Sequence, residues 1–350
     1  MLINSLAVLV SVAISAAVIL MLIAKAEALG LVQAPVARSS HVKPTPTGGG
    51  LGIVIAAVGA GLYLCWGDPN LTVLLALASM MALLGLVDDR RPLAAGIRFP
   101  IQALLVASLV WLADGASILV SQQFAVLYLP ACCFLAVTGL WWVNLYNFMD
   151  GIDGIAGQQA IFMLAAAMLT AVLQHSGAQG ESLWWVMAST LGAAAAFLAF
   201  NWPPARIFMG DAGSTFLGFA IFAFALLTVR AGWVTVPQWL LFAALFVVDA
   251  TVTLITRFFR RERVTEAHRS HAYQRFSRYL GGARPVTSAA FAFNLLVLLP
   301  LALAISENDG LLAYGVVTVV YALLAAFAVA TGAGLKDEEE GIFIMGKKRD

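Results

Sequence analysis

Acidic side chains with metal-binding chemistry recur along this sequence, each time at the end of an apolar stretch. The first are Asp88 and Asp89, adjacent carboxylates that repel each other unless a cation or a proton joins them. The segment 144–154 contributes Asp150 and Asp153 and contains no basic residue. Hard oxygen ligands without a nearby thiol or imidazole favour Mg²⁺ or Mn²⁺, so we predict a Mg²⁺ (or Mn²⁺) site here. The amides of this segment that we expect to contact a substrate are Asn144 and Asn147.

Two further segments carry groups suited to phosphate. Asp211, Gly213 and Ser214 stand where an apolar stretch begins, and a helix N-terminus with small residues is a natural anion site. An ordinary helix cap by Asp211 or Ser214 explains the same residues equally well. Lys43 precedes three glycines at 48–50, whose backbone N–H groups could cradle a phosphate, although a flexible loop before a span is the simpler interpretation.

Residues 268–275, the histidine segment, read His-Arg-Ser-His-Ala-Tyr-Gln-Arg. This is a dense set of hydrogen-bond donors suited to phosphate oxygens or sugar hydroxyls. Two histidines three residues apart could also bind zinc, but no third ligand is near. We therefore predict that His268, His271 and Arg275 contact a substrate.

The elements that must position these residues are membrane-spanning helices. The chain has 350 residues, 61% hydrophobic and 11% charged, and a soluble domain could not hide so much apolar surface. We predict an all-α, polytopic integral membrane protein with about eleven transmembrane helices. The net charge of +1 gives no indication of a nucleic-acid partner. The predicted spans are 4–24, 50–66, 71–87, 99–115, 126–146, 155–174, 183–200, 213–229, 233–255, 286–305 and 311–331.

Basic residues lie almost entirely in alternate loops. The loops at 25–49, 88–98, 147–154, 201–212 and 256–285, with the C-terminal tail, hold 19 of the 20 Lys and Arg residues, and Arg230 is the exception. The positive-inside rule places these loops in the cytosol, the N-terminus outside and the C-terminus inside. We find no linker, so we predict a single transmembrane catalytic domain over 1–335 and a cytosolic tail over 336–350.

Six carboxylates collect at the predicted cytosolic ends of the spans. An ionised carboxylate deep in hydrocarbon costs roughly 2.5–3.5 kcal/mol or more, so their convergence indicates a shared polar site. For Asp249 taken alone, a simpler explanation fits equally well: a carboxylate at the end of a span that belongs to no site. The six are Asp88, Asp89, Asp150, Asp153, Asp211 and Asp249.

Five stretches together resemble one family, the polyprenyl-phosphate N-acetylhexosamine-1-phosphate transferases. This family includes the initiators of O-antigen and enterobacterial common antigen synthesis and the peptidoglycan translocase MraY. The histidine segment looks more like that of O-antigen and capsule initiators, because it lacks the run of three histidines of MraY. The five stretches, in order, are 44–50, 88–89, 144–154, 208–214 and 268–275.

The resemblance implies a role for each stretch. Asp153 and Asp211 would be metal ligands that bridge the donor diphosphate, and Asp88 and Asp89 would act at the acceptor phosphate. Arg98 stands where the family often has a basic residue near the phosphates, and the histidine segment would recognise the donor sugar. The predicted catalytic residues are thus Asp88, Asp89 and Asp150, the metal ligands Asp153 and Asp211, and the substrate-binding residues Lys43, Arg98, Asn144, Asn147, Gly213, Ser214, His268, His271 and Arg275.

The implied reaction transfers an N-acetylated sugar-1-phosphate from a UDP-sugar to undecaprenyl phosphate, giving undecaprenyl-diphosphate-sugar and UMP. It would be the first membrane step of O-antigen, and so lipopolysaccharide, or of other cell-surface polysaccharide synthesis, at the cytosolic face of the bacterial inner membrane. The partners would be these two substrates and membrane lipid, and a homodimer stays open, as does a covalent aspartyl-phosphate route. The main alternative is a secondary transporter, but transporters usually place polar groups near the midplane and repeat their halves.

Overall fold

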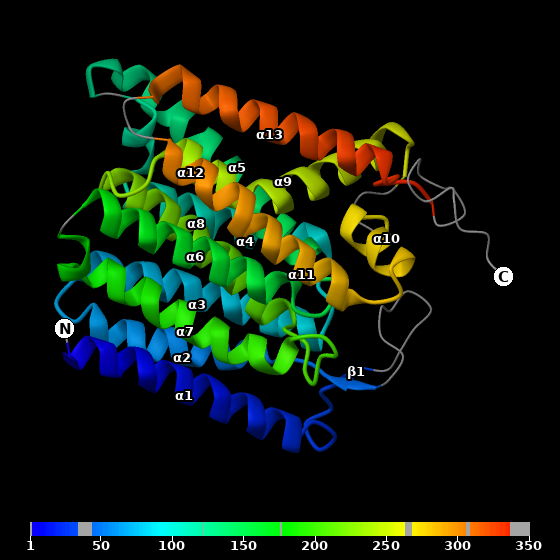
Figure 1. Cartoon of the computed structure of the whole chain (residues 1–350). Helices are drawn as coiled ribbons and strands as arrows, with labels where there is room; N and C mark the ends of the chain where they lie inside the picture. The colour runs from blue at the N-terminus through cyan, green and yellow to red at the C-terminus, as the bar shows by residue number, and fades with distance from the viewer. Residues whose placement is uncertain are drawn as a thin grey trace.

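The chain folds into a bundle of long helices that lie side by side (Figure 1). The computed structural model describes residues 2–33, 44–120, 122–175, 177–262, 268–305 and 309–336. The long helices are α1 (Leu2–Ala24), α3 (Pro69–Arg90), α4 (Ala95–Leu112), α5 (Tyr128–Met149), α6 (Ile155–Gln174), α7 (Ser182–Asn201), α8 (Asp211–Arg230), α9 (Val236–Phe259) and α13 (Gly310–Ala330). The shorter elements are β1 (Val32–Gln33), β2 (Thr45–Pro46), α2 (Gly50–Leu64), η1 (Gly115–Ile118), η2 (Gln122–Leu127), η3 (Ala178–Gly180), α10 (Ala272–Tyr279), α11 (Ala283–Phe293), η4 (Asn294–Leu298) and α12 (Leu299–Ala304).

Within the described residues, ten helical stretches are long and apolar enough to cross a membrane, and α2 is a shorter apolar helix of 15 residues. Together with α2, these stretches correspond in order to the eleven predicted spans. The start of α1 and the end of α13 accordingly lie at opposite ends of the bundle (Figure 1). The prediction of an all-α polytopic membrane protein is confirmed.

The stretch Ala283–Ala304 is not one regular helix. It runs from α11 through the π-helical segment η4 into α12. Pro300, which has no N–H to give to the helix ladder, stands in the first turn of α12. The wider π turn just before it lets the chain pass the proline without ending the span.

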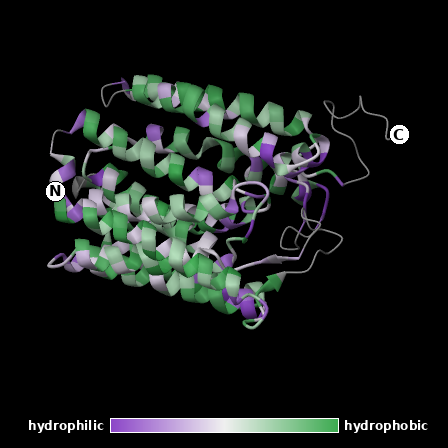
Figure 2. Cartoon of the chain, turned by 60° about the horizontal axis from the view of Figure 1, so that its bottom comes forward, coloured by the Kyte–Doolittle hydropathy of each residue, from purple (hydrophilic) through white to green (hydrophobic). Residues whose placement is uncertain are grey.

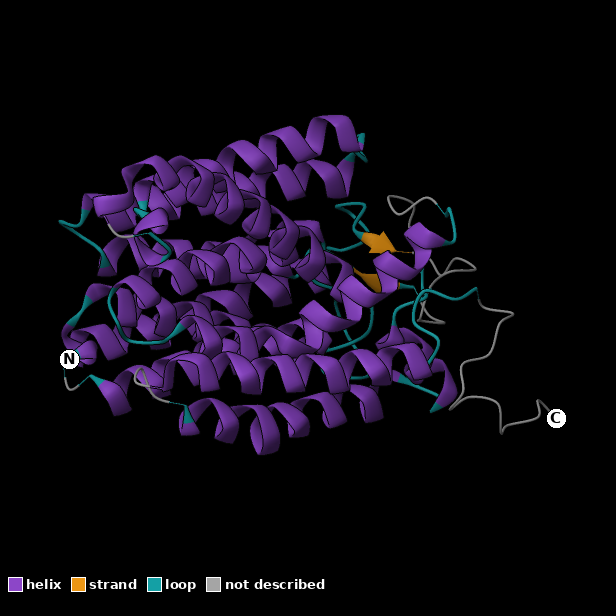
Figure 3. Ribbon diagram, turned by 90° about the horizontal axis from the view of Figure 1, so that it is seen from above, coloured by secondary structure: helices purple, strands orange, loops and turns teal. Residues whose placement is uncertain are grey.

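One end of the bundle, which we call the polar end, carries most of the structure between helices. The two-residue strands β1 and β2 pair antiparallel there, with Val32 opposite Pro46, and α10 lies at the same end (Figures 1 and 3). The helices are apolar over most of their length, and hydrophilic loops gather around this end (Figure 2). The helix α8 is the most deeply buried of the long apolar helices.

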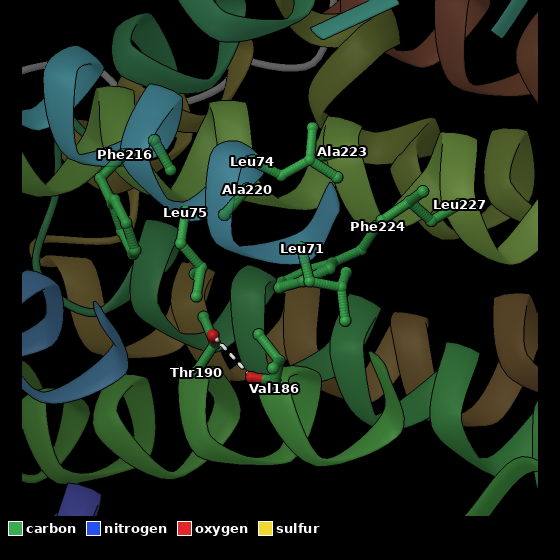
Figure 4. A pocket seen from close by; sticks show the side chains of 11 residues that line it. Leu71, Leu74, Leu75, Val186, Thr190, Phe216, Ala220, Ala223, Phe224 and Leu227 are labelled. Carbon is green, nitrogen blue, oxygen red and sulfur yellow. Dashed lines mark hydrogen bonds between the residues drawn. The ribbon is translucent and has the colours of Figure 1, made fainter. Parts of the chain in front are cut away.

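An apolar crevice lies between α3, α7 and α8, away from the polar end. It is lined by leucine, alanine, valine and phenylalanine side chains and by Thr190, whose hydroxyl donates to the Val186 carbonyl (2.9 Å; Figure 4). No charged side chain lines it. The crevice therefore offers apolar packing and no polar chemistry.

Candidate active site

The polar end is built around the first turn of α8. A Cβ added to Gly50 would lie 2.3 Å from the Gly213 Cα, so α2 and α8 meet backbone to backbone. A Cβ on Gly85 would lie 2.4 Å from the Asp211 carbonyl oxygen, so α3 passes α8 just as closely. Only glycine allows such approaches, and they fix where the residues at the start of α8 stand.

The glycines at 48–50 do not form the predicted phosphate cradle. The N–H of Gly49 donates to the Phe208 carbonyl (2.8 Å) and that of Gly50 to the Met209 carbonyl (2.9 Å). These N–H groups are used to join α2 to the segment before α8, so the prediction is wrong for them. Lys43 lies outside the described residues, and its predicted contact stays a prediction.

The N-terminus of α8 does bind an anion, but that anion is a side chain of the protein. Asp89 accepts the N–H groups of Asp211 (2.8 Å) and Ala212 (3.0 Å), one on each carboxylate oxygen. The next two N–H groups, of Gly213 and Ser214, donate to the Gly210 carbonyl. The first turn of α8 therefore has no free N–H for a substrate phosphate, and the predicted anion site is occupied by Asp89.

Asp88 faces a different set of partners. Its Oδ1 accepts the Leu93 N–H (2.7 Å), and its Oδ2 lies 2.6 Å from Nη1 of Arg98 in a salt bridge. The side chain is 7% exposed, so the charge of Asp88 is compensated by Arg98 inside the protein. Arg98 is thus joined to the acidic cluster, and its predicted contact with the substrate phosphates stays a prediction.

Asn147 joins the end of α5 to the start of α8. Its Nδ2 donates to Asp211 Oδ1 and to the Ser214 hydroxyl, both at 3.0 Å. Asn144, one turn earlier, is buried and donates to Gln102 on α4 (2.9 Å). Asn147 therefore orients a predicted metal ligand, whereas Asn144 ties two spans together.

The loop at 150–153 is held by the segments around it. Asp153 Oδ2 accepts the Ala205 N–H (2.9 Å), and the Asp153 carbonyl accepts the Thr287 hydroxyl (2.8 Å). Asn201 accepts the Gly154 N–H (2.9 Å) and donates to the Ile207 carbonyl (2.8 Å). The loop is thereby locked to the segment that leads into α8 and to α11.

Negative charge is concentrated between these segments. Burial raises the pKa of Asp150 well above its usual range, and the charges of Asp211, Asp89 and Asp153 raise it further. Asp88 and Asp211 also lie close enough for their carboxyl groups to interact. The structure therefore brings five of the six predicted acidic residues together, from three separate parts of the chain.

The histidine segment packs directly on this loop. The Tyr273 hydroxyl donates to the Phe148 carbonyl (3.0 Å), and a Cβ on Gly151 would lie 2.2 Å from that hydroxyl oxygen and 2.6 Å from Gln274 Nε2. The rings of His268 and His271 stack with centroids 4.9 Å apart. Burial lowers the pKa of His268 to about 3, and the neighbouring His271 and Arg257 contribute, so the His268 ring is neutral at pH 7. Tyr273 and Gln274 therefore lie beside the 150–153 loop.

Arg275 lies apart from the acidic cluster. Its Nε donates to the Thr331 carbonyl (3.0 Å), and its Nη1 to the carbonyls of Leu335 and Lys336 (both 3.3 Å). The guanidinium thus binds the C-terminus of α13. Its predicted contact with substrate stays a prediction.

Several residues that support the site were missed in the sequence. Asn201, Thr287 and Arg284 hold the loops in place, and Arg284 does so through the Pro203 carbonyl (2.6 and 3.1 Å). Asp249 was identified, but its partners were not. The only signal in the sequence is that these residues are polar and stand next to span ends, which does not reveal their partners.

The donor set suits a hard cation. Asp150, Asp153 and Asp211 offer carboxylate oxygens, and Asn147 steadies one of them. Among the described residues no three acidic, histidine or cysteine side chains already form a metal cage. That is compatible with Mg²⁺, which keeps several waters and binds through one or two carboxylates together with substrate phosphates.

Comparison with known proteins agrees with this arrangement. The profile of glycosyl transferase family 4 matches residues 71–229. The chain is 31% identical over 265 residues to the probable undecaprenyl-phosphate N-acetylglucosaminyl 1-phosphate transferase of Bacillus subtilis (strain 168), covering 71% of this chain and 70% of that protein.

Two other relatives are matched over a smaller share of their length. The decaprenyl-phosphate N-acetylglucosaminephosphotransferase of Mycobacterium tuberculosis (strain CDC 1551 / Oshkosh) is 33% identical over 57% of this chain and 54% of its own length. The phospho-N-acetylmuramoyl-pentapeptide-transferase of Moorella thermoacetica (strain ATCC 39073 / JCM 9320) is 35% identical over 53% of this chain and 61% of its own. The resemblance inferred from the motifs is confirmed: this chain belongs to the polyprenyl-phosphate N-acetylhexosamine-1-phosphate transferases of glycosyl transferase family 4 and is an enzyme of that family.

Proposed function

We propose that this protein transfers an N-acetylated sugar-1-phosphate from a UDP-sugar to undecaprenyl phosphate, releasing UMP, as the first membrane step of O-antigen or another cell-surface polysaccharide. The observation that carries the proposal is the convergence of Asp88, Asp89, Asp150, Asp153 and Asp211 at one end of an apolar bundle. Two relatives whose names specify N-acetylglucosamine transfer to a polyprenyl phosphate support the choice of donor and acceptor classes.

The placement of the acids favours a transferase over a secondary transporter. Asp88 and Asp89 are among the last residues of α3, Asp150 directly follows α5, and Asp211 is the first residue of α8. A transporter would need its ionisable residues near the midplane. Carboxylates at span ends instead suit a lipid phosphate that sits at the membrane surface while its chain stays in the bilayer.

Phosphoryl transfer depends mainly on positioning and charge neutralisation. A bound Mg²⁺ or Mn²⁺ would supply Lewis-acid neutralisation of the donor diphosphate, and Asp153 and Asp211 are the residues that would hold it. Asn147 orients Asp211, and the Ala205 N–H orients Asp153, so both carboxylates are preorganised. Arg98, already paired with Asp88, provides positive charge next to the cluster.

The acceptor needs little help from a base. A phosphate monoester has a second pKa of about 6 and is mostly dianionic at pH 7. Asp88 is therefore proposed to place the acceptor phosphate, together with Arg98, rather than to remove an essential proton. A direct, in-line displacement follows from this, without a covalent aspartyl intermediate.

We further propose that the polar end faces the cytosol of a bacterium, in its inner membrane. In the sequence, 19 of the 20 Lys and Arg residues fall in the segments predicted to be cytosolic, and UDP-sugars are made in the cytosol. The histidine segment would then meet the donor from the aqueous side.

The experiment that tests the function is UMP release by the purified protein with undecaprenyl phosphate and a panel of UDP-N-acetylhexosamines. We expect release with UDP-N-acetylglucosamine or a 6-deoxy relative, abolished by EDTA and restored by Mg²⁺ or Mn²⁺. Absence of UMP release with every donor in the panel, from monodisperse protein with both cations, would reject the proposed reaction.

A further inference from the structure

Asp249 is a buried carboxylate just past the middle of α9, and its main partners belong to the histidine segment. Its side chain is held on both oxygens: Oδ1 accepts the Ala272 N–H and Oδ2 the Tyr273 N–H, each at 2.9 Å. The Thr253 hydroxyl, one turn further along α9, lies 3.2 Å from Oδ1. Asp249 is 8% exposed, so these bonds form where water cannot replace them.

The helix α10 depends on such a partner. It has only eight residues, too few to be stable alone, and its first N–H groups have no partner within the helix. Its N-cap residue, His271, makes no side-chain cap. Asp249 supplies the cap from another helix, and its negative charge also suits the positive end of the α10 dipole.

Asp249 also orients His271. The Nδ1 of His271 lies 3.3 Å from Asp249 Oδ1, and because a carboxylate only accepts, Nδ1 carries the proton. The His271 side chain is 2% exposed, so Asp249 fixes a ring that is packed inside the protein rather than open to water. His268 stacks on this ring, so its orientation follows from that of His271.

The same contacts dock the segment onto the acidic loop. Tyr273, whose N–H Asp249 binds, donates its hydroxyl to the Phe148 carbonyl, and Gly151 leaves room for that hydroxyl and for Gln274. A shift at Asp249 would therefore move both the histidine rings and the groups packed on the 150–153 loop.

We propose that Asp249 is a positioning residue: it holds the histidine segment against the 150–153 loop in the orientation that binds the UDP-sugar donor. The inference rests on the proposed transferase function and deepens it, because it assigns donor affinity to a residue that need not touch the donor. It predicts a defect in donor binding rather than in chemistry.

The first test is Asp249→Asn, which keeps the size of the side chain but loses its charge and one of its two acceptors. We expect the donor KM to rise at least about tenfold, with a smaller fall in kcat and an unchanged KM for undecaprenyl phosphate. The Kd of UDP-N-acetylglucosamine, measured by calorimetry without acceptor, should rise by a similar factor. The matched control is Asp68→Asn, the same change at the N-cap of α3, where Asp68 accepts the Leu71 N–H (3.0 Å) at the other end of the bundle; both constants should stay unchanged there.

A double-mutant cycle separates positioning from simple support of the fold. If Asp249 acts largely through His271, the two changes should not act independently. The donor KM of the double variant Asp249→Asn/His271→Ala, relative to wild type, should then rise by much less than the product of the two single fold-changes. Thr253→Val, which removes only the hydroxyl bond to Asp249, gives a milder variant if Asp249→Asn fails to fold. We expect it to raise the donor KM about two- to fivefold at unchanged Tm.

The outcomes are distinguishable. If the wild-type protein releases UMP but folded Asp249→Asn keeps donor KM and Kd within about twofold, or the single effects simply multiply, the positioning role is rejected and the proposed function stands. If Asp249→Asn does not fold, an unchanged donor KM in Thr253→Val rejects it equally. If the wild-type protein neither binds a UDP-sugar nor releases UMP, the proposed function fails, and this inference fails with it.

Discussion

Asp88 and Asp89 are neighbours in sequence, yet they bind different partners. Asp89 uses both oxygens on backbone N–H groups of α8, whereas Asp88 is paired with Arg98. Asp153 keeps one oxygen on the Ala205 N–H. A carboxylate that binds backbone N–H groups with both oxygens mainly stabilises the fold. We therefore expect variants of Asp89 to lower stability and variants of Asp153 to lower turnover.

Asp153→Asn should nearly abolish turnover while leaving the fold intact. The asparagine carbonyl can still accept the Ala205 N–H, but the ligand charge is lost. Loss of one preorganised charge-stabilising group costs about 2.7–4 kcal/mol, roughly a hundred- to a thousandfold in kcat. The measurement is UMP release at saturating Mg²⁺, with Tm in detergent as the control for folding. Turnover above about a tenth of wild type means that less than about 1.4 kcal/mol was lost, and Asp153 is then not a metal ligand.

Asp89→Ala should instead lower the stability of the protein. It leaves the Asp211 and Ala212 N–H groups without a partner at the start of the most buried span. A lost helix cap costs about 0.5–2 kcal/mol. We expect a clear fall in Tm that accompanies any loss of turnover. An unchanged Tm with lost turnover would show that Asp89 serves the substrate and not α8.

The sequence predicted which acidic residues gather but not what each one binds. Five of the six meet at the polar end because each ends or begins an apolar span, and spans are visible in composition. The partners are not visible, because Asp89 and Asp211 are 122 residues apart and Asp249 and Ala272 are 23 apart across a loop. The sequence alone therefore could not distinguish a carboxylate that caps a helix from one that is free to bind a metal ion or substrate.

At the scale of elements, the packing of α2 and α3 on α8 sets the geometry of the site. Gly50, Gly85 and Gly213 are the points of closest approach. In the sequence, the glycines at 48–50 fitted a flexible loop or a phosphate cradle, since glycine clusters serve both phosphate binding and close backbone approach. Local sequence cannot distinguish these uses when the contacting backbone lies far along the chain.

Gly50→Ala should destabilise the bundle and reduce turnover together. The new methyl group would lie 2.3 Å from the Gly213 Cα, which is backbone and cannot rotate away, and overpacking of this kind typically costs about 1–3 kcal/mol. Gly59→Ala in the same helix is the matched control, because a Cβ there meets nothing within 4 Å. We expect a lower Tm and lower UMP release for Gly50→Ala only. Equal behaviour of the two variants would show that α2 and α8 can separate without harm to the site.

Spans could be predicted with boundaries close to those observed, whereas α10 could not. The thickness of the bilayer requires about 20 apolar residues in each span. Such a run can be recognised in the sequence without knowing what the helix packs against. The eight residues of α10 lie in a charged segment between two spans. The helix is held by contacts with other elements: the Tyr273 N–H donates to Asp249 of α9, the Tyr273 hydroxyl to the Phe148 carbonyl of α5, and Arg275 to the Thr331 carbonyl after α13. Its stability comes from tertiary contacts that the sequence does not reveal.

At the scale of the whole molecule, an odd number of passes puts the start of α1 and the end of α13 at opposite ends of the bundle (Figure 1). The polar end carries α10, both strands and the acidic cluster, while the other end carries short connections such as η1 and η3. The acidic cluster and the longer connecting segments thus lie at the same end of the bundle. The side of the membrane that each end faces then decides whether a cytosolic nucleotide sugar can reach the site.

The orientation can be measured with single cysteines in a background from which Cys65, Cys132 and Cys133 have been removed. Ala94→Cys, an exposed position between α3 and α4, reports the polar end, and Trp66→Cys, 90% exposed between α2 and α3, reports the other end. With 19 of 20 basic residues in loops assigned to the polar end, we expect a membrane-impermeant maleimide to label Trp66→Cys on intact cells. Ala94→Cys should react only after the membrane is permeabilised.

The cysteine-free protein is the control for background labelling, and activity of each variant shows that its topology is native. The reverse labelling pattern would place the acidic cluster outside the cell, where cytosolic UDP-sugars cannot reach it, and would overturn the proposed reaction as well as the orientation.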